Sequence, residues 1–287
     1  MDDFTGARSV ITGGASGIGF GLATALLEEG AAAVALVDIE AGALEDAVDR
    51  LQAAELGGHV IGLTCDVTDP TSVEEMAAAA WRELGSVEVV CLNAGVFAGG
   101  AVWETTEADW DWVLGVNLRG VINGIRAFVP QLIEAGDPAH VLITASIAGI
   151  VAAPASGVYC TSKFAAVGLA ESLHHDLQLS GNTHVATSVI CPGMVATNID
   201  HGERNRPSAL GARTDTPTSN LATGAIAETL RSDAALDPLV GARHALGQAK
   251  AGRFYTTTHE GDLWERLVGN ENEDRLAGRP PRFQMYE

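Results

Sequence analysis

Short β-branched segments alternate with longer segments of helical periodicity along the first two thirds of this chain. The strand-like segments are 7–12, 33–38, 59–64, 87–92, 139–145 and 184–190, and the helical ones are about 18–29, 42–55, 70–84, 107–134 and 158–180. Such alternation builds βαβ units, in which the strands run parallel and helices cover both faces of the sheet. We therefore predict a single α/β domain with a Rossmann-type, doubly wound parallel sheet, whose ligands bind beyond the carboxyl ends of the strands.

The rest of the chain adds a seventh strand and two irregular regions. Helical patterns near 223–232 and 237–251 flank an apolar segment at 254–258, so we predict about seven strands in all. Residues 192–221 are polar and rich in Pro and Gly, and long segments of this kind are lids, binding loops or disordered inserts. We expect residues 193–235 to form a substrate-binding lid with its helices, and a passive insert is the alternative. Residues 262–287 predict a C-terminal surface arm.

Charge and cysteine content narrow the possible functions. The 287 residues include 37 Asp and Glu against 17 Lys and Arg, a net charge of −20. Such a surface repels phosphate backbones and anionic lipids, so we expect no nucleic-acid or membrane partner. No C-x-x-C pair or His cluster predicts a metal site. The acidic N-terminus and the lack of a long apolar run favour a cytoplasmic location. Four widely spaced cysteines, predicted to be buried thiols, agree with it: Cys65, Cys91, Cys160 and Cys191.

A glycine-rich loop joins the first strand to the first helix. It runs from Thr12 to Gly19 with the sequence Thr-Gly-Gly-Ala-Ser-Gly-Ile-Gly. Glycines let the backbone turn tightly and approach a pyrophosphate, and the helix that follows offers free N–H groups and the positive end of its dipole. Because the loop lies between a strand and a helix, it predicts a dinucleotide site.

An aspartate ends the second strand. The carboxylate of Asp38 can accept hydrogen bonds from both hydroxyls of an adenosine ribose and would repel a 2′-phosphate. No Arg or Lys lies in the glycine loop or directly after Asp38. The sequence therefore favours NAD over NADP, although a helix cap is the alternative role for Asp38. Asp66, after the third strand, has the same two interpretations.

A tyrosine, a lysine and a serine could supply acid–base chemistry. Tyr159 and Lys163 are four residues apart on a predicted helix and so share one face. A cation about 4–5 Å from a phenol would lower its pKa by about 2–3 units, enough for proton exchange near neutral pH. A core tyrosine beside a solvated lysine is the alternative. Ser146 directly follows the fifth strand, at the same sheet edge as the glycine loop, where its hydroxyl could orient a reacting oxygen.

Together these motifs resemble the short-chain dehydrogenase/reductase family over residues 6–258. The loop fits the family pattern T-G-x-x-x-G-x-G, and the family's N-A-G element, which here follows Leu92 rather than the frequent Asn, fits residues 93–95. The resemblance implies four catalytic residues: Asn117, Ser146, Tyr159 and Lys163. It further implies cofactor contacts from these residues: Thr12, Gly13, Ser16, Gly17, Ile18, Gly19, Asp38, Asp66, Val67, Asn93, Ala94, Gly95, Tyr159, Lys163, Pro192, Gly193, Val195 and Thr197.

The expected activity is the interconversion of a secondary alcohol and its ketone by hydride transfer with NAD. Tyr159 would act as general base or acid, Ser146 would bind the reacting oxygen, Lys163 would lower the tyrosine pKa, and Asn117 would position a water molecule. A bulky hydrophobic substrate is expected, because the predicted pocket residues are mostly apolar: Phe97, Ile147, Ala148, Ala153 and Met194. Three lid arginines argue against an apolar pocket unless solvent covers them: Arg204, Arg206 and Arg213.

Further similarity supports this substrate class. Residues 110–118 and 128–130 resemble bacterial alcohol dehydrogenases that accept bulky ketones. The helices near 107–134 and 158–180 are apolar on more than one face, and the family resemblance implies that they form subunit contacts in a homotetramer or homodimer. Two alternatives stay open on the same fold. One is a non-redox reaction, such as dehydration or epimerisation, with bound cofactor, and the other is a non-catalytic NAD-binding module.

Overall fold

The computed structural model describes residues 1, 3–213 and 215–283 of the chain. Its centre is a parallel sheet with the strand order β3-β2-β1-β4-β5-β6-β7. The predicted seventh strand is therefore confirmed. The strands are β1 (Arg8–Thr12), β2 (Ala33–Asp38), β3 (His59–Thr64), β4 (Val89–Leu92), β5 (Ala139–Thr144), β6 (Val185–Cys191) and β7 (Tyr255–Thr257).

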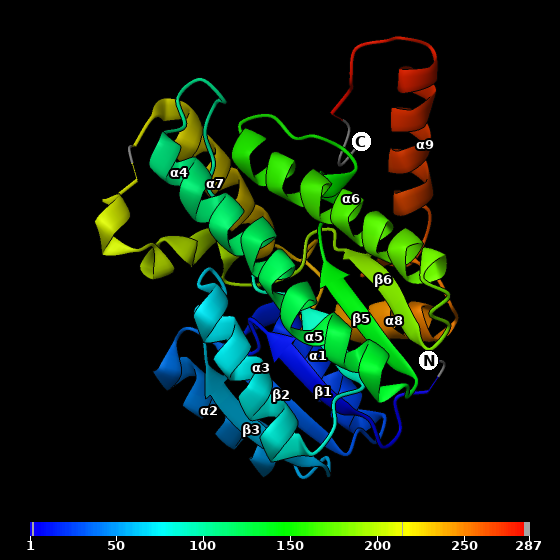
Figure 1. Cartoon of the computed structure of the whole chain (residues 1–287). Coiled ribbons are helices and arrows are strands. Elements are labelled where there is room, and N and C mark those ends of the chain that lie inside the picture. Colours follow the sequence, from blue (N-terminus) through cyan, green and yellow to red (C-terminus); the bar gives the residue numbers. More distant parts are fainter. Residues whose placement is uncertain (2, 214, 284–287) are drawn as a thin grey trace.

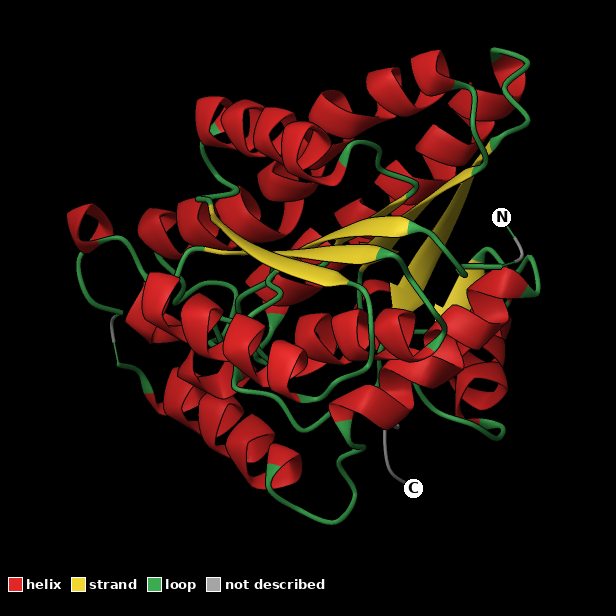
Figure 2. Cartoon of the chain, turned by 90° about the horizontal axis from the view of Figure 1, so that it is seen from below, coloured by secondary structure: helices red, strands yellow, loops and turns green. Residues whose placement is uncertain are grey.

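Helices cover both faces of this sheet (Figure 2). One apolar core lies between the sheet and the helices α3, α5 and α6, and a second lies between the sheet and α1, α2 and α8. The helices are α1 (Gly17–Glu28), α2 (Ala41–Ala53), α3 (Pro70–Leu84), α4 (Glu107–Leu114), α5 (Gly120–Ala135), α6 (Gly157–Leu179), α7 (Pro217–Leu230), α8 (Pro238–Lys250) and α9 (Leu263–Leu276).

The sequence explains the central strands and several helix starts. All six residues of β5 are buried, because helices cover it on both sides, and such strands are mostly apolar rather than alternating. Helix α3 begins after Asp69, whose carboxylate accepts a hydrogen bond from the Thr71 amide at 3.0 Å. The cap of α8 is similar, with Asp237 accepting from the Leu239 amide at 2.9 Å. In both helices proline occupies the first turn.

Three regions differ from the expectation. The segment predicted as one helix over 107–134 consists of α4, a five-residue π-turn (Gly115–Arg119) and α5. The lid segment contains short 3-10 helices, Ile199–Asn205 and Ser208–Leu210, before α7. The region expected as a surface arm begins with α9, which stands beside α6 (Figure 1).

Candidate functional site

A cavity of about 690 Å³ lies at the carboxyl ends of the central strands. Its walls include the loops that follow β1, β2, β3, β4, β5 and β6, together with the lid and α7. The strand order reverses between β1 and β4, and in doubly wound sheets ligands bind at this reversal. Most of the predicted cofactor residues and all five predicted pocket residues line this cavity. The exceptions among the cofactor residues are Thr12 and Gly19, and the predicted catalytic residue Asn117 is also not among the lining residues.

The glycine loop forms a cradle that side chains would fill. Gly13 and Gly17 have φ angles of 64° and 53°, in the left-handed region that favours glycine. A Cβ atom at Gly19 would lie 2.1 Å from the Gly13 carbonyl oxygen and 2.7 Å from Nδ2 of Asn93. Ser16, the N-cap of α1, makes no capping hydrogen bond with its side chain, so the first N–H groups of the helix stay available for an anion. These features fit a dinucleotide pyrophosphate.

Thr12 and Asn93 brace the loop from behind. The Asn93 side-chain amide donates to the carbonyls of Thr12 at 3.0 Å and Gly13 at 3.3 Å. The Thr12 hydroxyl accepts from the amides of Asn93 at 2.9 Å and Ala94 at 3.1 Å, and donates to the Cys91 carbonyl at 3.3 Å. These two side chains therefore join the ends of β1 and β4 and hold the cradle in shape.

Asp38 lies where the adenosine ribose is expected. It accepts hydrogen bonds from the Ala15 amide at 3.1 Å and the Glu40 amide at 3.2 Å, which fixes its carboxylate beside the glycine loop. Asp66 also lines the cavity, but one of its carboxylate oxygens accepts from the amide and hydroxyl of Thr68, as in a local turn. Asp66 therefore has the contacts of the predicted turn residue, and its position in the cavity wall leaves its predicted cofactor contact as a prediction.

The lid brings a cation to this side of the cavity, which the sequence did not predict. Arg204 donates to Glu40 through Nε at 3.0 Å and lies within 2.8 Å of it through Nη2, while Asn205 donates to the same carboxylate at 2.8 Å. Residues 40 and 204 are far apart in the sequence, so local spacing gives no signal of this pair. The residues that follow Asp38 in the sequence thus include no Arg or Lys, but the fold brings Arg204 to Glu40 in the same cavity wall.

Ser146, Tyr159 and Lys163 meet in the same cavity. Ser146 caps a 3-10 turn, Ile147–Gly149, by accepting from the Ala148 amide at 3.1 Å. Tyr159 and Lys163 lie in the first turns of α6, with the lysine Nζ 5.7 Å from the centre of the phenol ring. Nζ donates to the Thr144 carbonyl at the end of β5, at 3.0 Å. A phenol and an amine from α6 and a hydroxyl from the loop after β5 are thus brought together.

Burial has the largest effect on the pKa values of Tyr159 and Lys163. It raises the pKa of Tyr159 to about 12, with hydrogen bonding to Ser146 acting in the opposite direction. It lowers the pKa of Lys163 to about 8. Burial thus moves the pKa of Tyr159 away from neutrality, opposite to the direction that the spacing to Lys163 predicts, because the phenol loses its contact with solvent.

Asn117 occupies the π-turn between α4 and α5. Its Oδ1 accepts from the Val96 amide at 2.8 Å, and its Nδ2 donates to the Val96 carbonyl and the Ser162 hydroxyl, both at 2.9 Å. The side chain is 1% exposed. Asn117 therefore fixes the loop after β4 against α6, and the π-turn explains why a polar residue is buried in an otherwise regular helical segment.

The loop after β6 closes the side of the cavity next to the glycine cradle. The Gly193 amide donates to the Thr258 hydroxyl at 3.3 Å, and Val195 forms a parallel bridge with Leu236. A Cβ at Gly17 would lie 3.0 Å from the methyl group of Thr197, so this threonine sits directly over the loop. Pro192, Gly193, Val195 and Thr197 all line the cavity, as predicted.

Apolar side chains form the remaining walls. Phe97 meets the Tyr159 ring edge-on, with 5.2 Å between ring centroids, and Trp112 lines the cavity from α4. Sequence reasoning missed one face of α7, although apolar residues at intervals of three and four in its sequence could have revealed it. The missed lining residues of α7 are Leu221, Ala222, Ala225, Ile226, Thr229 and Leu230, and Phe283 was missed in the C-terminal region.

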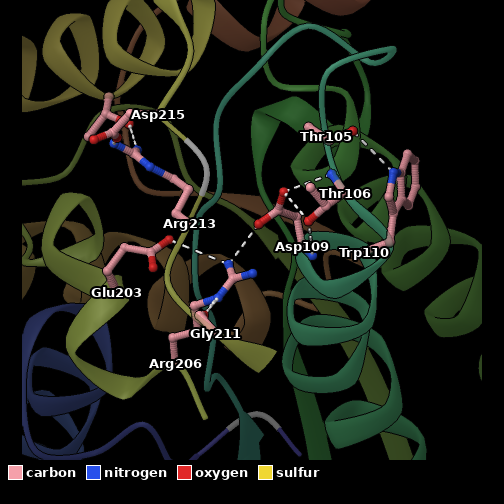
Figure 3. Close-up of polar contacts among 10 residues, drawn as sticks. Thr105, Thr106, Asp109, Trp110, Glu203, Arg206, Gly211, Arg213 and Asp215 are labelled. Carbon is pink, nitrogen blue, oxygen red and sulfur yellow. Dashed lines mark hydrogen bonds and ion pairs between the residues drawn. The ribbon is translucent and has the colours of Figure 1, made fainter. Parts of the chain in front are cut away.

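A buried ion pair anchors the lid to the start of α4 (Figure 3). Arg206 lies 2.7 Å from Asp109, and the two side chains are 4% and 7% exposed. Asp109 also accepts from the amide and hydroxyl of Thr106, which caps α4, and Arg206 donates to the Gly211 carbonyl at 2.8 Å. Glu203 lies 3.7 Å from Arg206, and burial raises the pKa of its carboxyl. Arg206 is thus a structural anchor and not a solvated loop residue.

The remaining observations on the described residues concern metal-binding clusters, cysteines and membrane-spanning helices. No cluster of three or more His, Cys, Asp or Glu side chains in residues 1, 3–213 and 215–283 is arranged to hold a metal ion. The cysteines are free and buried, as predicted. Across the same described residues, no helix is long and apolar enough to span a membrane.

Comparison with known proteins identifies the family. A family model for short chain dehydrogenases matches residues 8–208. The chain is 40% identical over 232 residues to 1-deoxy-11-beta-hydroxypentalenate dehydrogenase of Streptomyces arenae, covering 78% of this chain and 79% of the relative. A short-chain dehydrogenase/reductase from Burkholderia phymatum, solved in complex with NAD, has a TM-score of 0.93 and 37% identity, with complete coverage of both chains.

A second solved structure shows that cofactor use varies among such relatives. The alcohol dehydrogenase of Thermococcus sibiricus, complexed with 5-hydroxy-NADP, has a TM-score of 0.63 and 28% identity, covering 80% of this chain and 94% of its own. The dehydrogenase relatives, the matching family model and the Rossmann-type sheet all agree. This chain is an oxidoreductase that belongs to the short-chain dehydrogenase/reductase family.

Proposed function

We propose that this protein interconverts a bulky hydrophobic secondary alcohol and its ketone, with NAD as the hydride carrier. The observation that supports this most strongly is the convergence of Ser146, Tyr159 and Lys163 in the same cavity as the glycine cradle and Asp38. A proton-transfer group and a dinucleotide site that share one cavity can remove a proton and a hydride from the same alcohol.

The bound nicotinamide would supply hydride transfer, and this chain would supply binding and proton transfer. The glycine cradle and the N-terminus of α1 would hold the pyrophosphate, Asp38 would hold the adenosine ribose, and Lys163 would hold the nicotinamide ribose. Ser146 orients the reacting oxygen, and Tyr159 accepts its proton in oxidation and returns one in reduction. Asn117, through the loop after β4, positions a water molecule that connects Lys163 to solvent.

Because the pKa of Tyr159 is raised, the rates of alcohol oxidation and ketone reduction should depend on pH. A base must be ionised to accept a proton, and burial brings the pKa of this phenol to about 12. The oxidised nicotinamide carries a positive charge, which favours the phenolate. Alcohol oxidation should therefore become faster as the pH rises from neutral, whereas ketone reduction, which needs the protonated phenol, should slow only as the pH approaches the raised pKa.

The cofactor and substrate classes follow from charge and polarity. Asp38 and Glu40 place two carboxylates near the expected ribose, and Glu40 already pairs with Arg204, so a 2′-phosphate would meet net negative charge. This supports NAD over NADP. The walls offered by Phe97, Trp112 and α7 are apolar and suit an aryl or polycyclic alcohol. The hydroxylated substrate in the name of the Streptomyces arenae relative agrees with an alcohol donor.

We further infer a homotetramer or homodimer and a cytoplasmic location. Ile133 on α5 and Leu179 on α6 are 40% and 88% exposed, and burial between subunits would remove these apolar side chains from water. Four free, buried thiols fit a reducing compartment. Size-exclusion chromatography with light scattering tests the proposed oligomeric state, because a monomer in solution would contradict a homotetramer or homodimer.

A spectrophotometric screen at alkaline pH tests the function. Purified protein is supplied with NAD or NADP and with 2-propanol, 1-phenylethanol, 1-(2-naphthyl)ethanol or a polycyclic alcohol, and formation of the reduced cofactor is followed by absorbance. We expect turnover with NAD and the bulky alcohols. A preference for NADP would contradict the role of Asp38. Binding of NAD without turnover of any alcohol would favour a non-redox reaction or a binding module.

A further inference from the structure

The C-terminal segment reaches the cavity that contains the proposed catalytic residues. Phe283 is one of its lining residues, together with Ser146 and Tyr159. The Phe283 side chain is 46% exposed. An aromatic ring half exposed to solvent in a cavity wall gains free energy when an apolar ligand covers it. Phe283 therefore has the position and the chemistry of a ligand contact.

Helix α9, which precedes this segment, packs against the loop that carries Ser146, the residue proposed to bind the reacting oxygen. Leu267 of α9 is 3% exposed and packs with Ile147 and Val151. Ile147 follows Ser146 directly and itself lines the cavity. Arg275 of α9 lies over the ring of Phe164, with 6.0 Å between the guanidinium carbon and the ring centre. Packing at both ends of α9 thus fixes this helix against α6 and the loop after β5.

Ion pairs of Asp274 with Arg279 and Arg282, which we call the ionic clamp, hold the chain where it reverses direction after α9. Asp274 has a side chain that is 3% exposed. It accepts from Nε of Arg279 at 2.7 Å and from Nε and Nη2 of Arg282 at 2.7 and 2.9 Å. The Arg279 amide also donates to the Asp274 carbonyl at 2.9 Å. Figure 1 shows the chain reversing at the far end of α9 and returning toward α6. The clamp ends at Arg282, immediately before Phe283.

We infer that Phe283 is a substrate-binding residue and Asp274 is the residue that positions it. The ring of Phe283 contacts the apolar body of a bulky alcohol or ketone while Ser146 and Tyr159 hold its oxygen. This inference rests on the proposed function, since it assigns a specificity residue to the same cavity. A small alcohol held by its oxygen at Ser146 and Tyr159 has little apolar surface for this wall to cover.

Steady-state kinetics with a large and a small alcohol, 1-(2-naphthyl)ethanol and 2-propanol, test this assignment. For Phe283→Ala we expect the Michaelis constant for the naphthyl alcohol to rise about three- to tenfold, the range of a lost aromatic contact, with kcat unchanged within twofold. The kinetics with the small alcohol should not change. Phe283→Leu should keep most of the affinity, because it stays apolar. Asp274→Asn should raise the same Michaelis constant, because the clamp on Arg279 and Arg282 weakens.

A binding measurement separates this inference from the proposed function. Calorimetry with 2-acetonaphthone and NAD⁺ requires no turnover, and Phe283→Ala should weaken ketone binding by the same three- to tenfold factor. Leu276→Ala is the matched control, since Leu276 is 92% exposed on α9 and does not line the cavity. The inference is overturned if Phe283→Ala leaves ketone affinity unchanged, if the control has an equal effect, or if wild-type protein does not bind the ketone. Failure of every alcohol to react, with this binding pattern intact, would refute only the proposed function.

Discussion

Replacement of Arg206 by methionine should free the lid from α4 while the sheet stays folded. The substitution removes the cation from a pair whose side chains are 4% and 7% exposed, and it keeps most of the apolar stem beside Trp112. Removal of one partner from a buried ion pair costs about 3–5 kcal/mol. Asp109 keeps its hydrogen bonds from Thr106 and lies at a helix N-terminus, so we expect a loss at or below the lower end, about 2–3 kcal/mol.

Hydrogen exchange can measure that loss locally. If the lid opens as a unit, 2–3 kcal/mol corresponds to amide exchange about 30- to 150-fold faster within residues 199–213. Arg243→Met is the matched control, because Arg243 pairs with Glu28 through two hydrogen bonds but is 52% exposed, and exposed pairs contribute about 0–1 kcal/mol. Lid exchange in Arg206→Met within threefold of wild type, with circular dichroism unchanged, would refute the role of Arg206 as an anchor.

Three further predictions concern the cradle and the lid. Gly19→Ala should abolish measurable NAD binding in calorimetry, because its Cβ would lie 2.1 Å from the Gly13 carbonyl oxygen, and retained affinity would contradict the cradle. Glu40→Gln should speed NADH dissociation about two- to fivefold in stopped-flow fluorescence, since it weakens an exposed pair with Arg204, and an unchanged rate would contradict lid closure at this point. Glu203→Gln should slightly raise the free energy of unfolding at neutral pH, because burial raises the pKa of this carboxyl and so disfavours its ionised form. The gain should vanish as the pH falls below the ordinary value of 4.5, where the wild-type carboxyl becomes protonated in both the folded and the unfolded state, and a gain that persists in acid would contradict this reasoning.

The sheet and the cradle could be predicted because their signals are local. Strands covered on both faces are continuous apolar segments, so β2 and β5 stand out in the sequence. The glycine loop, Asp38 and Ser146 each follow a strand directly, and the parallel order then brings the strand ends to one edge. The family resemblance supplied Asn117 and the loop after β6, for which the sequence alone gave no specific chemistry.

The features that could not be predicted depend on contacts between distant residues. The Glu40–Arg204 and Asp109–Arg206 pairs join segments about a hundred or more residues apart. Helix α9 has a polar sequence, and its place in the fold depends on Leu267 packing against Ile147. The tyrosine pKa moved opposite to expectation because the degree of burial is a tertiary property that the Tyr-x-x-x-Lys spacing does not contain.

The most direct test of the proposed chemistry compares wild type with Tyr159→Phe in the oxidation of 1-(2-naphthyl)ethanol by NAD⁺ at alkaline pH. We predict turnover by the wild type and a loss of at least about 100-fold in the variant, because general acid–base groups contribute about 10²–10⁴-fold. Calorimetry should show NAD affinity unchanged within twofold, which separates loss of chemistry from loss of the fold. Turnover by Tyr159→Phe above a few per cent of the wild-type rate would contradict the assignment of Tyr159 as the acid–base residue.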